Sequence, residues 1–358
     1  FIDPACTIPY VAQTVTTVYV RPTALQLAAT SWSFTASATL GNGCPISEFI
    51  TINNKTKLWK GTVDNNWYNA NNWEPVGVPD ATTCVFIYDG PFDSNINIAG
   101  NDAYAYSLTV RPSGLLDIQP NNDLTVTNTV TVDAGGTFNI ENNGSLVQVN
   151  NVANSGSVNS KRIAVTNNIL DYVYWSTPVA GFSVNNITPS SIYRYAWNPT
   201  TVTGYASNFG NWTAASGAMT TGRGYIIRGS SGNTTFAGVP NNGNITIPIT
   251  RGTYTSLTNY AGPTATPVTR DDDNWNLLGN PYPSALSADA FLTANLANLA
   301  PSVKIWTHGI DPAAIADNWK EPLVFPHSLP TICAVDASTP KTEISKEQVS
   351  LKIVGVQL

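Results

Sequence analysis

The feature that most constrains the fold is a series of short β-forming segments within residues 104–165. Segments of three to five residues, among them Ser107–Val110, Leu115–Ile118 and Thr137–Ile140, alternate with small polar corners such as Asn142-Asn143-Gly144. Such repetition is typical of a parallel β-helix, in which stacked coils bury one continuous core. A β-sandwich with short hairpins is the alternative, but the segments are short and uniform, which favours the solenoid.

Alternate side chains of a solenoid strand point into the core. The residues expected inside are Leu108, Val110, Leu116, Ile118, Val126, Val132, Phe138, Ile140 and Val149. Asn pairs recur at the corners, at 121–122, 142–143 and 150–151, and could stack into hydrogen-bonded ladders.

The rest of the sequence also favours strands. Charged residues make up 11% of the 358 residues, less than half of the roughly 25% typical of soluble domains. Asn, Thr, Ser and Gly replace them, and the 10 Trp and 15 Tyr suit half-buried strands. Ser287–Ala300 is the one Ala- and Leu-rich stretch that could be helical. The expected fold class is all-β: a short parallel β-helix or solenoid segment flanked by β-sandwich-like domains.

Changes of composition divide the chain into five parts. Residues 1–53 predict a small β-sandwich-like module, too short for the seven strands of an immunoglobulin-like sandwich, which leaves open a truncation. Residues 54–103 predict an aromatic capping or linker region, and residues 104–165 the β-solenoid. Residues 166–330 carry longer aromatic segments and predict a β-sandwich or jelly-roll-like domain. Residues 331–358 form a tail richer in Lys and Glu.

Trp67 and Trp73 of the capping region allow two interpretations. Exposed Trp beside Asn can stack on sugar rings, which would make the pair a glycan-binding site. Alternatively, the rings plug the open end of the solenoid, whose core and strand edges would otherwise be exposed. We favour the plug, because an uncovered solenoid end promotes aggregation.

The four cysteines predict disulfides in preference to a metal site. None lies in a CxxC motif and only two His are present, which disfavours zinc. An even count in a β-rich chain is typical of an oxidising compartment. Cys6 and Cys44 bracket the first module and are expected to pair, leaving Cys84 and Cys333 to pair across a long loop or to stay free.

Charge and hydropathy disfavour several classes of protein. The net charge is −6, from 17 basic and 23 acidic residues, and the basic residues do not cluster. Binding to nucleic acid or to an anionic membrane surface needs clustered cations. No long apolar run occurs, so no membrane span is expected. The chain begins at Phe1 without Met or a signal peptide, as expected of a processed product or a fragment.

Asp271, Asp272 and Asp273 form the sharpest candidate metal cluster, since three carboxylates could supply oxygen ligands to Ca²⁺. Neighbouring residues of a strand point to opposite faces, so a solvated acidic loop is the alternative that we favour. His308 and His327 lack the flanking residues of a known nucleophile motif. No catalytic residue is predicted, and no cofactor beyond this Ca²⁺ candidate.

Four motifs follow one another in the C-terminal half: Tyr174–Val179, Gly222–Ile226, Phe236–Gly243 and Trp275–Ser284. This ordered series resembles the C-terminal region of large Bacteroidota surface proteins that are exported by the type IX secretion system. Trp59-Lys60-Gly61 and the Asn- and Gly-rich repeats also look like that family.

The resemblance covers roughly residues 55–310, and Leu277–Ser284 is its most specific element. It implies a protein outside the cell or on its outer surface, often an adhesin, a gliding-motility filament component or a carrier of other modules. The implied partners are the type IX translocon and its shuttle proteins during export, and cell-surface proteins or extracellular glycans afterwards. Such proteins usually end in a β-sandwich sorting domain, for which residues 331–358 are too few. Three explanations stay open: the sorting domain lies beyond Leu358, it has been removed, or the tail is something else.

The sequence therefore predicts a secreted structural or adhesive surface protein with no catalysis of its own. The alternative is a carbohydrate-binding accessory module of a secreted glycan-degrading enzyme, which the abundance of Trp suggests.

Overall fold

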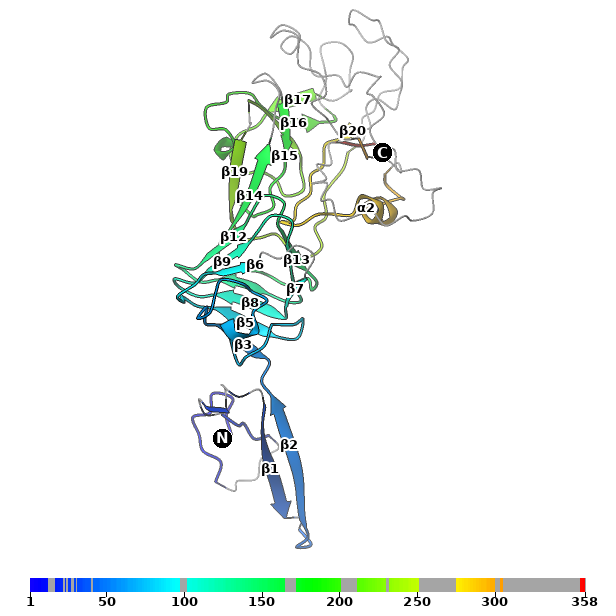
Figure 1. The fold of residues 1–358 in the computed structure, drawn as a ribbon. Coiled ribbons are helices and arrows are strands. Elements are labelled where there is room, and N and C mark those ends of the chain that lie inside the picture. Colours follow the sequence, from blue (N-terminus) through cyan, green and yellow to red (C-terminus); the bar gives the residue numbers. More distant parts are fainter. Residues whose placement is uncertain are drawn as a thin grey trace, which may run out of the picture.

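The structure, a computed structural model, describes residues 1–11, 17–21, 23, 25–26, 29, 31–39, 41–96, 102–164, 172–200, 211–229, 232–250, 275–299, 303–304 and 355–357. Nearly all of its regular structure is β, with a solenoid of about three turns and several further sheets. The expected all-β class with a solenoid is confirmed. Figure 1 shows the solenoid between a long hairpin and an antiparallel sheet.

Three stacks of parallel strands form the solenoid. The strands are β3 (Thr56–Trp59), β5 (Cys84–Ile87), β6 (Ser94–Ile96), β7 (Ala103–Ala105), β8 (Ser107–Val110), β9 (Leu115–Ile118), β10 (Asp123–Val126), β11 (Val130–Val132), β12 (Thr137–Ile140), β13 (Ser145–Gln148) and β14 (Val158–Ala164). The stacks are β3-β5-β8-β11, β6-β9-β12-β14 and β7-β10-β13. Leu116 is in register with Phe138, and Leu124 with Leu146, in each case 22 residues further along the chain. Since β3 pairs in parallel with β5, the solenoid begins within the part expected to cap it.

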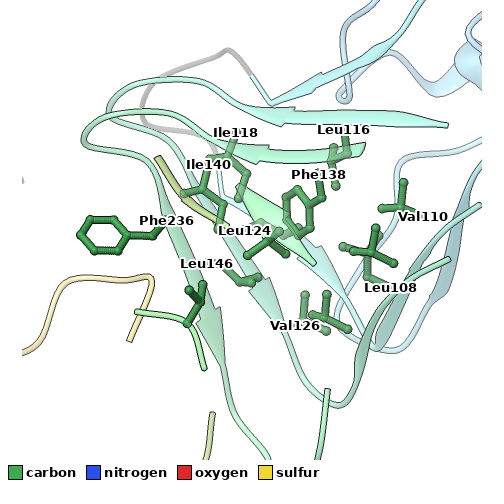
Figure 2. Close-up of a cluster of buried hydrophobic side chains, with 14 of the residues drawn as sticks. Leu108, Val110, Leu116, Ile118, Leu124, Val126, Phe138, Ile140, Leu146 and Phe236 are labelled. Atoms are coloured by element: carbon green, nitrogen blue, oxygen red, sulfur yellow. The ribbon is translucent and has the colours of Figure 1, made fainter. Parts of the chain in front are cut away.

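The solenoid core follows from the alternation of apolar residues. Figure 2 shows side chains from successive coils meeting inside. Eight of the nine residues expected to point inward are buried, and Leu124, Val130 and Leu146 join them. Val149 is 64% exposed, so its prediction was wrong. Leu146 points inward in β13, and alternation from Leu146 turns Val149 outward.

An amide ladder does form, but along the strands and not at the predicted corner pairs. Asn159 Nδ2 donates to Asn139 Oδ1 at 2.9 Å, and Asn139 Nδ2 donates to Asp117 Oδ1 at 2.7 Å. Parallel register brings these three side chains above one another on adjacent coils. The corners use left-handed backbone instead, with φ of 62° at Asn121 and 65° at Asn143.

A two-stranded antiparallel hairpin precedes the solenoid and projects away from it (Figure 1). Its strands are β1 (Ser31–Thr39) and β2 (Pro45–Asn53). The rings of Trp32 and Phe34 stack on one face, with centroids 5.6 Å apart. In the described part of residues 1–53 this hairpin has no second sheet packed on it, unlike the sandwich-like module that was expected.

A four-stranded antiparallel sheet follows the solenoid, in the order β15 (Tyr172–Trp175), β18 (Tyr225–Arg228), β16 (Arg194–Asn198) and β17 (Asn211–Ala214). The strand β19 (Gly232–Gly238) pairs antiparallel with β14 and so extends a solenoid stack. The buried side chains Val173, Trp175, Tyr225, Ile227 and Phe236 belong to the same hydrophobic cluster as the solenoid core. One core therefore runs through both parts.

Short elements complete the described chain. They are β4 (Trp73–Glu74), β20 (Trp275–Asn276), β21 (Val303–Lys304), β22 (Gly355–Gln357), the 3₁₀ turns η1 (Ala70–Asn72) and η2 (Val184–Asn186), and the helix α2 (Ala288–Ala294). Helix α2 confirms the predicted helical stretch, and the Ser287 hydroxyl caps it by accepting the Ala290 N–H at 3.2 Å. No helix of the described chain has the length and apolarity to cross a membrane.

Candidate functional site

Trp59, Trp67 and Trp73 close the N-terminal end of the solenoid, with exposed fractions of 1%, 0% and 2%. The Trp73 ring meets Trp59 and Trp67 edge to face, at centroid distances of 4.9 and 4.7 Å. Trp73 Nε1 donates to the Trp67 carbonyl at 2.8 Å, and Trp59 Nε1 to the Phe92 carbonyl at 2.9 Å. Buried rings cannot stack on a sugar, so the glycan-binding interpretation of Trp67 and Trp73 was wrong. The cluster is the predicted plug.

Cys6 and Cys44, which were expected to pair, are free thiols in the structure. Cys44 lies in the exposed turn at the tip of the hairpin, where its N–H donates to Asn42 Oδ1 at 3.0 Å. The structure therefore does not contain the expected Cys6–Cys44 disulfide. Cys84, in β5, is also a free thiol, and its candidate partner Cys333 lies outside the described residues.

The candidate Ca²⁺ ligands Asp271, Asp272 and Asp273 lie outside the described residues, as do His308 and His327. Among the residues that the structure does describe, no group of three or more His, Cys, Asp or Glu side chains could hold a metal ion.

The four motifs of the C-terminal half, far apart in sequence, meet at one junction. The Gly224 N–H donates to the Leu277 carbonyl at 3.0 Å, and the Gly279 N–H to the Gly222 carbonyl at 2.9 Å. The Ser176 hydroxyl donates to the Asn280 carbonyl at 2.7 Å. These three hydrogen bonds join the fourth motif, Trp275–Ser284, to the first and the second.

Two side chains bind three of these motifs to one another, and one of the three is Phe236–Gly243, which includes the loop after β19. Asn241 Nδ2 donates to the carbonyls of Thr177 and Pro281, at 3.3 and 2.9 Å. The Tyr282 hydroxyl donates to the Gly243 carbonyl at 2.6 Å, and burial raises the pKa of this phenol. A Cβ on Gly279 would lie 2.2 Å from Ser176 Cβ, so this close approach requires glycine.

The junction also forms hydrogen bonds with the last coil of the solenoid. The Leu146 N–H of β13 donates to the Pro283 carbonyl at 2.9 Å. Asn242 Nδ2 donates to the carbonyls of Asn150 and Val152, at 2.8 and 2.9 Å. The motif series is therefore the structure that closes the C-terminal end of the solenoid.

A cavity of about 90 Å³ lies where the junction meets the last coil. Its walls are Asn143, Gly144, Ser145, Arg162, Tyr174, Trp175, Ser176, Pro178, Gly224, Phe236, Leu277, Leu278, Gly279, Asn280, Tyr282, Ser284 and Ala285. Arg162 of β14 is the one cation of this wall. Its guanidinium donates to the carbonyls of Lys161, Glu141 and Gly144, at 2.7, 3.4 and 3.4 Å. Burial lowers the pKa of Arg162, because it disfavours the charged form.

A second candidate surface is the aromatic face of the four-stranded sheet, on the side away from the shared core. Tyr172, Tyr195, Trp197 and Trp212 lie there half-buried. The rings of Trp197 and Trp212 meet edge to face at 5.2 Å. The Arg228 guanidinium lies 6.0 Å from the Tyr172 ring centroid, and burial raises the pKa of Tyr172 to about 12.

Comparison with known proteins gives one match. Residues 58–346 match the family described as a domain of unknown function, DUF8693. The chain belongs to the DUF8693 family. No curated protein and no solved structure matches the chain. The DUF8693 match begins in β3 and takes in the tryptophan plug, the solenoid, the sheet and the junction, whereas the hairpin precedes it.

Sequence reasoning identified the motifs of this DUF8693 chain but not the cavity that they enclose. The sequence assigned no role to Arg162, which lies within residues 104–165, the predicted solenoid. The available signal was its place close to the C-terminal end of the predicted solenoid, where a long cationic side chain can reach the end of the last coil.

Proposed function

We propose that this DUF8693 chain is a structural or adhesive component of a bacterial outer surface, exported through the type IX route and without catalysis of its own. The observation that carries the proposal is the continuous hydrophobic cluster from the tryptophan plug to Trp175 and Phe236. Because one packed core joins the solenoid to the next sheet, we expect little movement between the two parts. A rigid spacer suits the display of a binding surface away from a membrane.

Two further observations support this role. The chain has few charges and many polar β-forming residues, which fits the protease-resistant surface of an exported protein. The junction motifs, on which the resemblance to type IX substrates rests, are tied together by Ser176, Asn241 and Tyr282. In this chain they close the C-terminal end of the solenoid.

Surface labelling tests the location. Antibodies raised against the purified chain should label intact cells of the organism that makes it, and the label should disappear when the type IX translocon is deleted. A periplasmic marker protein controls for leakage. Retention of the protein inside wild-type cells would contradict the export proposal, and turnover of a polysaccharide by the purified chain would contradict the absence of catalysis.

Carbohydrate binding is the second candidate, favoured by the half-buried rings of Trp197 and Trp212. Aromatic rings at a sheet surface can stack on sugar rings. A glycan array should then show a ligand whose binding is lost in Trp212→Ala. Trp32→Ala, on the hairpin, is the matched control and should bind normally. An array without any ligand above background would remove this candidate.

A further inference from the structure

The cavity at the junction has an unbalanced charge. Among the described residues that line it there is no Asp or Glu, whereas Arg162 contributes a guanidinium. The nearby Glu141 carboxylate forms an ion pair with Lys161. The other two ion pairs of the described chain, Lys60–Glu74 and Arg111–Asp133, lie elsewhere on the solenoid. Arg162 therefore has main-chain carbonyls as its partners in the described chain.

Carbonyl oxygens satisfy the N–H groups of a guanidinium but do not neutralise its charge. Two of the three carbonyl contacts of Arg162 are 3.4 Å long, at the outer limit of a hydrogen bond. A guanidinium prefers the paired oxygens of a carboxylate, which it can bind through two parallel hydrogen bonds. An anion in the cavity would thus compete with the two long contacts of Arg162, while the 2.7 Å hydrogen bond to the Lys161 carbonyl remains.

We propose that this cavity binds the carboxylate of a small organic acid. Asn143 and Ser284 also line the cavity, and an amide and a hydroxyl are side-chain groups that can donate to carboxylate oxygens. Trp175 and Phe236 are buried in the wall and lower the local polarity, which strengthens the attraction between the two charges. The cavity volume of about 90 Å³ is enough for a carboxylate and the atoms next to it, so the rest of a larger ligand would lie outside the cavity.

Titration calorimetry on the full chain tests the proposal, with D-glucuronate, acetate and D-glucose as probes. Glucuronate should bind saturably, and Arg162→Gln should weaken it by about tenfold or more, because a charge-assisted pair is lost. Arg111→Gln, which removes an equal charge from the solenoid surface, should leave binding unchanged. Tighter binding of glucuronate than of acetate would show that the sugar ring also contributes to binding. Equal binding of the two acids would show that the cavity recognises the carboxylate alone.

A second variant avoids the carbonyl contacts of Arg162, whose loss could disturb folding. Ala285 is exposed at the rim of the cavity, so Ala285→Phe should block the opening and reduce glucuronate binding without unfolding the chain. The proposal is overturned if neither acid binds at millimolar concentration, if glucose binds as well as glucuronate, or if folded Arg162→Gln and Ala285→Phe proteins bind like wild type. These measurements do not depend on where the protein resides, so they can fail while the surface role stands.

Discussion

Gln148 and Asn154 bind each other through both of their side-chain amides. Gln148 Nε2 donates to Asn154 Oδ1 at 2.9 Å, and Asn154 Nδ2 donates to Gln148 Oε1 at 2.7 Å. Asn154 also accepts the Val130 N–H and donates to the Pro240 carbonyl, both at 3.0 Å. Gln148 is in register with the buried Val126, so this polar pair occupies a core-facing position of the last coil. The pair links the solenoid to the loop after β19.

Loss of this amide pair should destabilise the chain strongly. Asn154→Ala leaves the Val130 N–H and Gln148 Oε1 without their partners, whereas Gln148 Nε2 keeps its hydrogen bond to the Asn128 carbonyl. Each unsatisfied group costs about 1–3 kcal/mol. We expect the free energy of unfolding in urea to fall by about 2–4 kcal/mol. Asn185→Ala, at an exposed position, is the control and should change it by less than about 0.5 kcal/mol. Equal effects of the two substitutions would contradict the role of the pair.

The tryptophan plug predicts a difference between two buried rings. Trp73 Nε1 donates to the Trp67 carbonyl, whereas Trp67 Nε1 is buried without a hydrogen-bond partner in the described chain. Phenylalanine at position 67 removes an unsatisfied N–H, which offsets part of the lost packing. Trp67→Phe should therefore be less destabilising than Trp73→Phe by about 1–2 kcal/mol, as measured by denaturant unfolding.

A larger truncation tests the plug itself. Trp73→Ala should cost about 3–5 kcal/mol, since it opens a cavity at the solenoid end. Tyr106→Ala removes an exposed ring from the same solenoid and should cost far less. If the two substitutions cost the same, the three-tryptophan cluster does not close the core.

A charge placed at two positions of one solenoid coil should have opposite outcomes. Phe138 is fully buried, so Phe138→Asp would place a charge in the dry core and should prevent folding or cost several kcal/mol. Val149, which the sequence pattern also placed inside, is 64% exposed, and Val149→Asp should be tolerated within about 0.5 kcal/mol. Far-ultraviolet circular dichroism and urea unfolding of both variants provide the measurement. An unfolded Val149→Asp protein would contradict the outward orientation of this side chain.

The contrast between Phe138 and Val149 shows what alternation can predict. Most solenoid residues repeat the apolar pattern of a strand, and local sequence is then enough to assign an inward face. Val149 follows a strand whose inward positions are Leu146 and Gln148, and a polar Gln at such a position hides the register. The hydrogen bonds with Asn154 and with the Asn128 carbonyl explain why Gln148 is acceptable there.

The cavity could not be predicted, because its walls come from distant parts of the chain. The Ser176 hydroxyl and the Asn280 carbonyl are separated by 104 residues, and both border the cavity. The motifs were visible in the sequence, but motif order alone does not show which residues face one another. Trp67 and Trp73 illustrate the same limit, since a Trp-rich segment is compatible with both an exposed platform and a buried plug.

The free thiols predict that oxidation is not needed for stability of the first module. Cys6→Ser and Cys44→Ser should each leave the unfolding midpoint unchanged, and mass spectrometry of the non-reduced digest should find both thiols unpaired. A Cys6–Cys44 peptide pair in that digest, with loss of stability on reduction, would instead restore the disulfide that the sequence predicts.

The Asp117 carboxylate predicts a pH dependence. Burial raises the pKa of Asp117, and the hydrogen bond from Asn139 only partly opposes that effect. The folded chain then holds the proton more tightly than the unfolded chain, so stability falls as pH rises from about 4 through the folded pKa. Asp117→Asn removes this penalty and keeps an acceptor for Asn139. It should raise the free energy of unfolding at pH 7, and the gain should disappear below about pH 4.

The Asp64 carboxylate predicts a pH dependence of stability with the opposite sign. Hydrogen bonds from the Asn69 side chain, the Asn66 N–H and the Asn72 side chain lower the pKa of Asp64. The ionised carboxylate is therefore favoured in the folded chain, and its contribution is complete above about pH 4 and is lost as pH falls through the folded pKa. Asp64→Asn should lower the free energy of unfolding at pH 7, with a loss that shrinks in acid. Urea unfolding of both variants between pH 3 and pH 7 separates the two cases. If the two substitutions change the free energy of unfolding at pH 7 in the same direction, the opposite signs assigned to Asp117 and Asp64 are contradicted.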